Sequence, residues 1–230
     1  MTSPLVSAVL FHIGPVPISR AVVTTWVIIL LLALGSALAT RRLKLSPTGL
    51  QSVLELIIDA FEGQIRDTMG VTPARYLPLI ATLFLFILAA NWSSIVPGVE
   101  PPTAHIETDA ALGAVVFVAV IVFGIRARGL LGYLKSFAEP TIFMAPLNFA
   151  EAFTRIFSMM VRLFGNVMSG VFVIGVVLSL AGLIVPIPLM ALDLLTGAIQ
   201  AYIFTVLAMV FIGSAVGGRA APDTKEEQLP

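Results

Sequence analysis

The sequence has no cysteine and few charged residues. Without cysteine, disulfide bonds, thiolate metal sites and cysteine nucleophiles are excluded. Only two histidines are present, His12 and His105, so we expect no histidine-ligated haem, no catalytic zinc and no other metal site. Charged residues make up 11% of the 230 residues, whereas a soluble domain has about 25%. A soluble fold could not cover its surface with so few charges.

Apolar residues dominate instead. Hydrophobic residues make up 58% of the chain, and the mean hydropathy is +1.03. Several apolar runs approach the roughly 20 residues that a helix needs to cross a bilayer. The composition therefore indicates an integral membrane protein. The net charge is zero and no basic cluster could follow a phosphate backbone, so we do not expect nucleic acid as a partner.

The apolar runs predict an all-α integral membrane protein with a single membrane domain over residues 1–230. Five transmembrane helices are expected, at residues 21–40, 77–96, 110–125, 146–182 and 189–213. Residues 1–20 have no basic residue ahead of a short apolar core, so we do not expect a secretory signal peptide there. Residues 214–230 are expected to form a polar cytoplasmic tail.

Residues 46–70 differ from the spans because charged and apolar residues alternate with a helical period. The apolar positions recur at i, i+3, i+4, i+7 and i+8, and they are Leu50, Val53, Leu54, Ile57, Ile58 and Phe61. The charged positions are Glu55, Asp59, Glu62, Arg66 and Asp67. This pattern predicts one amphipathic helix that lies at the membrane surface.

The basic residues indicate the orientation in the membrane. Five crossings place most of them on one side, namely Arg41, Arg42, Lys44, Arg66, Arg75, Arg126, Arg128, Lys135, Arg219 and Lys225. The two loops on the opposite side, residues 98–109 and 181–188, contain no Lys or Arg. By the positive-inside rule, the N-terminus is outside and the C-terminus is cytoplasmic.

The segment 146–182 is too long for an upright crossing. Its 37 residues would form a helix of roughly 55 Å, so the helix must tilt steeply, break or begin outside the bilayer. Polar residues recur every three or four positions and therefore share one face: Glu151, Arg155, Ser158, Arg162, Asn166 and Ser169. Arg162 lies near the middle, where an arginine costs between about 3 and 17 kcal/mol, depending on the method.

Structural explanations remain open for these polar residues. Arg162 could form an ion pair within the chain that stabilises the helix bundle. Arg155 could pair with Glu151, which precedes it by four residues in the favourable order. In the last span, Gln200 could make a packing hydrogen bond, while Asp193 is harder to explain without a function.

The outer loop adds two more acids, Glu107 and Asp109. Both could be ordinary solvated loop residues, or they could line an ion pathway at the outer mouth of the following span.

Several motifs together resemble subunit a of the membrane sector of F-type ATP synthases. They are RLFGN at 162–166, preceded by PLN at 146–148 and Glu151, then QAYIF at 200–204, and the outer hairpin formed by residues 91–97 with Pro102 and Thr103. The likeness covers nearly the whole chain and is weakest in residues 1–20. The arginine motif is highly specific, and a glutamine motif follows at the interval that the family shows.

The resemblance implies a role for each polar residue. Arg162 would be the arginine that faces the carboxylate of each rotor subunit and prevents an ion leak. Asn166 and Gln200 would occupy the polar positions nearby. The remaining residues divide between two half-channels: Glu151 and Arg155 on the cytoplasmic side, and Asp193 with Glu107 or Asp109 on the outer side.

Two departures from the family pattern affect the expected outer pathway and the identity of the coupling ion. Val171 stands where some members carry a Glu or a His, so Asp193 would have to carry more of the outer pathway. The short N-terminus resembles the sodium-associated, second-copy ATPases of some bacteria. Protons and sodium ions therefore both remain open as the coupling ion.

The resemblance implies a stator subunit without catalytic residues or a cofactor, in the bacterial inner membrane. Two offset half-channels would pass ions to and from the rotor and so couple ion flow to ATP synthesis or hydrolysis. The expected partners are the ring of c subunits, the peripheral-stalk b subunit, other synthase subunits and the lipid bilayer. The alternative is an independent secondary ion transporter, but the chain shows no internal repeat. An intramembrane enzyme would need a Ser-His, paired-Asp or metal arrangement, for which the sequence offers no candidate.

Overall fold

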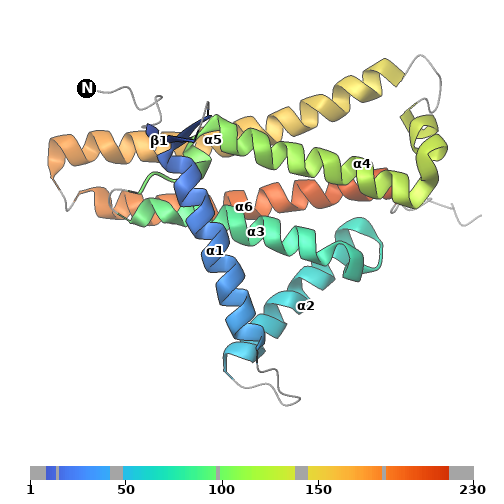
Figure 1. Ribbon diagram of the computed structural model, residues 1–230, viewed down its shortest axis with the longest axis horizontal. Coiled ribbons are helices and arrows are strands. Elements are labelled where there is room, and N and C mark those ends of the chain that lie inside the picture. Colours follow the sequence, from blue (N-terminus) through green and yellow to red (C-terminus); the bar gives the residue numbers. More distant parts are fainter. Residues whose placement is uncertain are drawn as a thin grey trace, which may run out of the picture.

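The computed structural model describes residues 9–13, 16–41, 49–96, 99–137, 145–182 and 185–217. The described helices are α1 (Arg20–Thr40), α2 (Leu50–Met69), α3 (Leu77–Trp92), α4 (Ile106–Phe137), α5 (Ala145–Ala181) and α6 (Pro186–Val216). Short 3-10 turns are η1 (Pro73–Arg75), η2 (Ser93–Ile95) and η3 (Pro102–Ala104). Five helices are long and apolar enough to cross a membrane. The expected all-α membrane fold is confirmed (Figure 1).

A small antiparallel hairpin precedes α1 and was not indicated by the sequence pattern. Its strands are β1 (Val9–Ile13) and β2 (Val16–Ser19). The last part of the expected tail, from residue 218 onward, and the expected start of the amphipathic helix at 46–48 lie outside the described residues.

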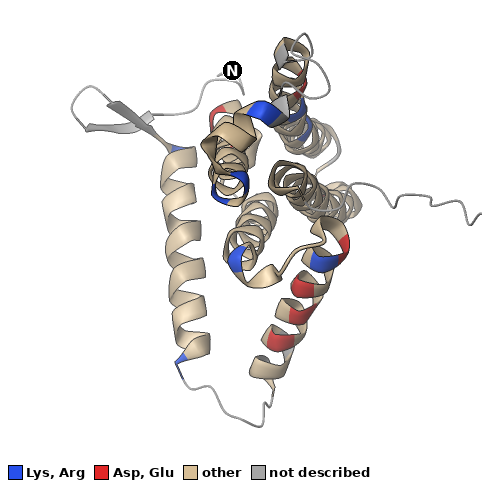
Figure 2. Cartoon of the chain, turned by 90° about the vertical axis from the view of Figure 1, so that its right-hand side faces the viewer, with Lys and Arg blue, Asp and Glu red and all other residues tan. Residues whose placement is uncertain are grey.

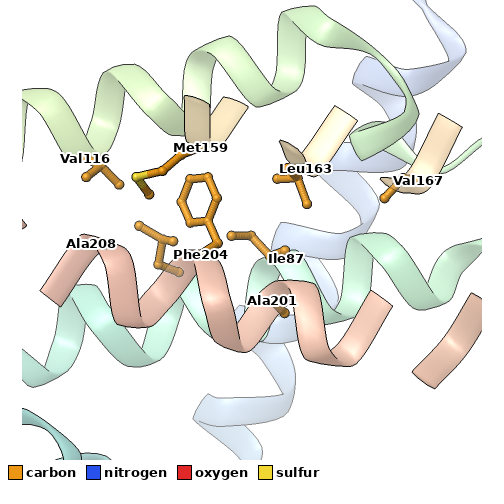
Figure 3. Close-up of a cluster of buried hydrophobic side chains, with 9 residues drawn as sticks. Ile87, Val116, Met159, Leu163, Val167, Ala201, Phe204 and Ala208 are labelled. Carbon is orange, nitrogen blue, oxygen red and sulfur yellow. The ribbon is translucent and has the colours of Figure 1, made fainter. Parts of the chain in front are cut away.

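Helices α3, α4, α5 and α6 pack together and enclose the main core. This cluster of buried side chains consists of Leu83, Ile87, Val116, Met159, Leu163, Val167, Ala201, Phe204 and Ala208. Phe204 of α6 points into the middle of it, between side chains of the other helices (Figure 3). Because the core draws on one face of α5, the rest of that long helix is free for other contacts.

The amphipathic helix α2 packs against this bundle through its C-terminal half. Ile65 and Met69 are buried in a second cluster with Tyr76, Ile80 and Ile212. Acidic residues recur along the length of α2 (Figure 2), and most of them are exposed. Gly70 ends the helix in the left-handed region, with φ of 65°, where a residue without Cβ is unstrained.

Helix α1 stands apart from the other spans. It is apolar all round, and only Ala21 and Ile28 are buried. Its axis diverges from those of the other spans (Figure 1). Most of its apolar surface is therefore left for lipid or a partner.

Helix α4 is longer than the expected span 110–125, because it continues beyond the apolar run. The backbone turns at Gly129, with φ of 74° and ψ of 164°, so that the end of α4 bends sharply (Figure 1). Tyr133 then packs back on Gly124, where a Cβ would lie only 2.6 Å from the ring. Helix α5, in contrast, is continuous over its 37 residues.

Candidate functional site

The polar stripe of α5 runs beside the face that packs in the bundle core. Met159, Leu163 and Val167 face the core and are buried. The polar residues lie on the adjoining side of the helix: Glu151, Arg155, Ser158, Arg162 and Ser169 are exposed, and Asn166 is half-buried. A membrane helix with an exposed polar face is unfavourable in lipid, so this face needs water or a partner.

Arg162 has no acidic partner among the residues that the structure describes. The ion pairs found there join Arg66 to Glu62, Arg155 to Glu151 and His105 to Glu100. The alternative of an ion pair that fixes the bundle therefore finds no support in the described part of the chain. The guanidinium is exposed in the middle of an apolar helix.

Arg155 forms the intrahelical pair that its spacing suggested. Its guanidinium donates to Glu151 Oε1, and both side chains are partly exposed. The same guanidinium carbon lies 5.7 Å from the ring centroid of Phe211 on α6, a cation–π distance. This pair thus links the N-terminal part of α5 to the C-terminal part of α6.

A cavity of about 770 Å³ adjoins this pair, where α5 diverges from α4 and α6. Its lining is mainly apolar, with Phe117, Ile156 and Phe211 among the side chains, while Glu151 and Arg155 supply charged groups. The polar stripe therefore borders an open volume at one end of α5.

Asp193 lies in the contact between α6 and α5. Ser94 Oγ lies 3.3 Å from Asp193 Oδ2 and 2.9 Å from the carbonyl oxygen of Asn91, so the two acceptors share its single proton. A Cβ at Gly170 would lie 2.0 Å from Asp193 Oδ1, so the carboxylate packs directly on the glycine backbone. The eight residues from Arg162 to Gly170 correspond to about 12 Å along α5. Asp193 therefore lies about two turns from the level of Arg162.

Gln200 and Asn166 are close to the core but do not bind Arg162. Gln200 is buried on α6, beside Ala201 and Gly197 in sequence. Asn166 Nδ2 is buried without a hydrogen-bond partner among the described residues. No hydrogen bond joins either side chain to Arg162 in that part of the chain. That Asn166 and Gln200 provide the polar surroundings of Arg162 remains an expectation.

The two outer acids have different surroundings. Glu107 is exposed in the first turn of α4 and fits a solvated residue. Asp109 is fully buried, and neither of its carboxylate oxygens has a hydrogen-bond partner among the described residues. The explanation of a solvated loop acid is therefore wrong for Asp109. Burying a charged carboxylate without a partner costs free energy, so a purely structural role does not explain the position of Asp109.

The structure adds residues to which the sequence assigned no role. Asn91, Trp92 and Ser94 bond to the turn of α6 that carries Asp193, and Thr103 bonds to Asn91. The outer-hairpin motif was the signal for them, but the three contacts with α6 join residues that lie 99 to 106 positions apart in the sequence. No local pattern singled out Gly170, because its role depends on the Asp193 carboxylate, which packs against it from another helix.

Fold and site together define a class: polytopic helical membrane proteins that expose a charged face within an apolar span. Comparison with known proteins narrows this class. Residues 22–213 match the family described as ATP synthase A chain.

Three relatives illustrate the match. ATP synthase subunit a 2 of Bradyrhizobium sp. is 58% identical, over 95% of this chain and 98% of the relative. ATP synthase subunit a 1 of Chlorobaculum parvum is 47% identical, over 92% and 94%. ATP synthase subunit a of Moorella thermoacetica is 42% identical, over 91% and 96%. The chain belongs to the ATP synthase A chain family, and the resemblance seen in its motifs is confirmed.

Proposed function

We propose that this chain is the stator subunit through which ions reach and leave the rotor of an ATP synthase, and that Arg162 faces the carboxylate of each passing c subunit. The observation that carries the proposal is the exposed guanidinium in the middle of α5, with no acidic partner among the described residues. A charge in that position needs water or a partner, and the carboxylate of another polypeptide would supply the partner.

The chemistry of arginine suits this role. A rotor carboxylate is neutral in lipid, since a bare charge there is costly. It releases its ion where it meets water and a permanent cation. The guanidinium stays protonated in proteins, so it attracts the ionised carboxylate but cannot relay a proton. Arg162 therefore separates two ion pathways that must not join.

Acidic groups at different levels along α5 support two offset half-channels. Glu151 lies 11 residues before Arg162, about 16 Å along the helix, and with Arg155 it would border the cytoplasmic half-channel. Asp193, about 12 Å beyond Arg162 at the level of Gly170, would belong to the outer half-channel.

Glu107 and Asp109 at the start of α4 would extend the outer half-channel, and Asn166 and Gln200 would provide polar surroundings near Arg162. Both half-channels would pass either protons or sodium ions.

The proposed function implies partners and a membrane location for the subunit. The exposed polar stripe of α5 would contact the c ring, while the peripheral-stalk b subunit and other synthase subunits would contact the remaining surface. We infer a bacterial inner-membrane location with the N-terminus outside and the C-terminus cytoplasmic, because the basic residues lie on one side. The subunit itself is not catalytic. The membrane potential supplies about 2.3 kcal/mol per charge per 100 mV to bias rotation.

Replacing Arg162 tests the proposal directly. Arg162→Ala should abolish ion-coupled ATP synthesis in membrane vesicles while the soluble sector still hydrolyses ATP. Arg162→Lys should also fail, since an ammonium group can lose its proton in a desolvated site. Arg66→Ala, which removes an exposed arginine on α2, is the matched control and should retain synthesis. Normal coupled synthesis by Arg162→Ala would refute the assignment.

Purification separates this function from an independent transporter. The stator should co-purify with a ring of small c subunits, and the chain reconstituted alone should carry no ion flux. Ion or substrate flux by the isolated chain would favour the transporter instead.

A further inference from the structure

Three side chains at the end of α3 and in η2 donate hydrogen bonds to one short stretch of α6. Asn91 Nδ2 donates to the carbonyl oxygen of Gly197 at 2.8 Å. Trp92 Nε1 donates to the carbonyl oxygen of Leu194 at 3.1 Å. With the bond from Ser94 to Asp193 Oδ2, all the acceptors lie within little more than one helical turn. We call this set of contacts the α3–α6 clasp.

Thr103 of η3 fixes the amide of Asn91 in the clasp. Thr103 Oγ1 donates to Asn91 Oδ1 at 2.7 Å, and both side chains are buried. A carbonyl oxygen can only accept, so the amide must turn its NH₂ group toward Gly197. A rotated amide would place its oxygen against the carbonyl oxygen of Gly197. The Thr103 hydroxyl therefore selects the orientation in which the clasp closes.

The clasp leaves little room for adjustment. A Cβ at Gly197 would lie 3.1 Å from Asn91 Cβ, so the two helices approach closely at this point. In a buried site, a lost hydrogen bond leaves its partner unsatisfied rather than hydrated. A loosened Asn91 would thus release the α6 turn from α3 instead of exchanging one contact for another.

We propose that Thr103 is a positioning residue for ion transfer at Asp193, acting through Asn91; this rests on the function proposed above for Asp193. Thr103 does not touch the ion. It holds the α6 turn so that the Asp193 carboxylate stays between Ser94 and the backbone of Gly170. The outer hairpin would in this way determine where the outer half-channel meets α5.

A disulfide can report the position of the α6 turn. An ideal Cβ at Gly170 lies 2.8 Å from Asp193 Cγ. The sulfur of a cysteine at position 193 would lie close to the present position of that Cγ atom. The double variant Gly170→Cys, Asp193→Cys should therefore cross-link on mild oxidation of the whole synthase in membranes. The chain has no other cysteine, so mass spectrometry of its peptides identifies this bond without ambiguity.

Removing the hydroxyl of Thr103 should slow this cross-link. We expect Thr103→Val to lower its initial rate roughly five- to tenfold, and Thr103→Ser, which keeps the hydroxyl, to restore it. Thr82→Val is the matched control, because Thr82 Oγ1 donates within α3, to the carbonyl oxygen of Pro78. An unchanged rate in Thr103→Val overturns the proposal.

A folding role is distinguished by the amount of subunit in the membrane. If Thr103→Val fails to assemble, Thr103→Ala replaces it in the experiment, because alanine places no methyl group against Asn91. The same decrease in cross-linking rate is expected for Thr103→Ala. Failure of both variants, while Thr103→Ser and Thr82→Val assemble, would make the hydroxyl a folding requirement and overturn the positioning role.

Activity provides the second measurement. With Gly170 and Asp193 intact, Thr103→Val should slow ion-driven ATP synthesis several-fold without changing hydrolysis by the soluble sector, and Thr103→Ser should restore it. Synthesis at the parent rate in Thr103→Val would overturn the proposal even if the cross-link slowed. The Arg162→Ala test is separate, so failure of the stator assignment and failure of the clasp give different results.

Discussion

Arg162 extends from the exposed side of α5, whereas Asp193 is half-buried between α5 and α6, in contact with Ser94 and Gly170. The difference follows from their proposed tasks. A residue that meets successive rotor subunits must face outward, while a residue that receives ions from water must stay at a fixed place in a channel wall. The absence of a side chain at Gly170 creates the space for that carboxylate.

Neutralising the outer acids tests this picture at the residue scale. Asp193→Asn should slow ion-driven synthesis several-fold, because it removes the charge that attracts the ion next to α5. Glu107→Gln should cost less, since Glu107 is exposed at the start of α4. Initial rates of synthesis over a range of ion concentrations measure both effects. Unchanged ion dependence in both variants would place the outer half-channel elsewhere.

At the scale of elements, the polar stripe of α5 could be predicted and the clasp could not. Helical periodicity alone placed Arg155 and Arg162 on one face, because the positions repeat every three or four residues. Asn91 and Gly197 lie 106 residues apart, so no local pattern links them. The burial of Asp109 likewise depends on how the outer loop folds. The bend in α4 needed the positive φ of Gly129, which composition does not reveal.

The bend in α4 provides a prediction about stability. Alanine normally favours a helix over glycine, but Gly124→Ala should destabilise this protein, because the added Cβ would lie 2.6 Å from the Tyr133 ring. We expect a cost of about 1–3 kcal/mol, typical of overpacking. Gly35→Ala in α1, where a Cβ meets nothing within 4 Å, is the control. The thermal unfolding midpoint of the purified complex measures both. A midpoint for Gly124→Ala at or above the parent value would contradict the described packing.

At the scale of the whole molecule, the subunit is incomplete by itself. Helix α1 leaves most of its apolar surface uncovered, and α5 leaves charged groups open within a membrane span. Lipid satisfies the first surface but not the second. The charged face of α5 therefore needs water or a polar partner, and in the proposed function the c ring would supply that partner.

The orientation of the molecule can be measured, because the chain has no native cysteine. A cysteine introduced at Glu100, in the outer loop, should react with an impermeant thiol reagent added outside intact cells. One at Lys135, near the end of α4, should react only after the membrane is opened. The positive-inside rule gives this result, and the reverse labelling pattern would invert the proposed topology.

The central claim is that the Arg162 side of α5 meets the rotor carboxylate. Oxidative cross-linking in the whole synthase tests it most directly, with one cysteine at Ser158 on the exposed stripe and another beside the carboxylate of the c subunit. We predict a disulfide between the two subunits from position 158, and none from a cysteine at the buried Leu163. No cross-link from Ser158, or an equal yield from both positions, would contradict the account.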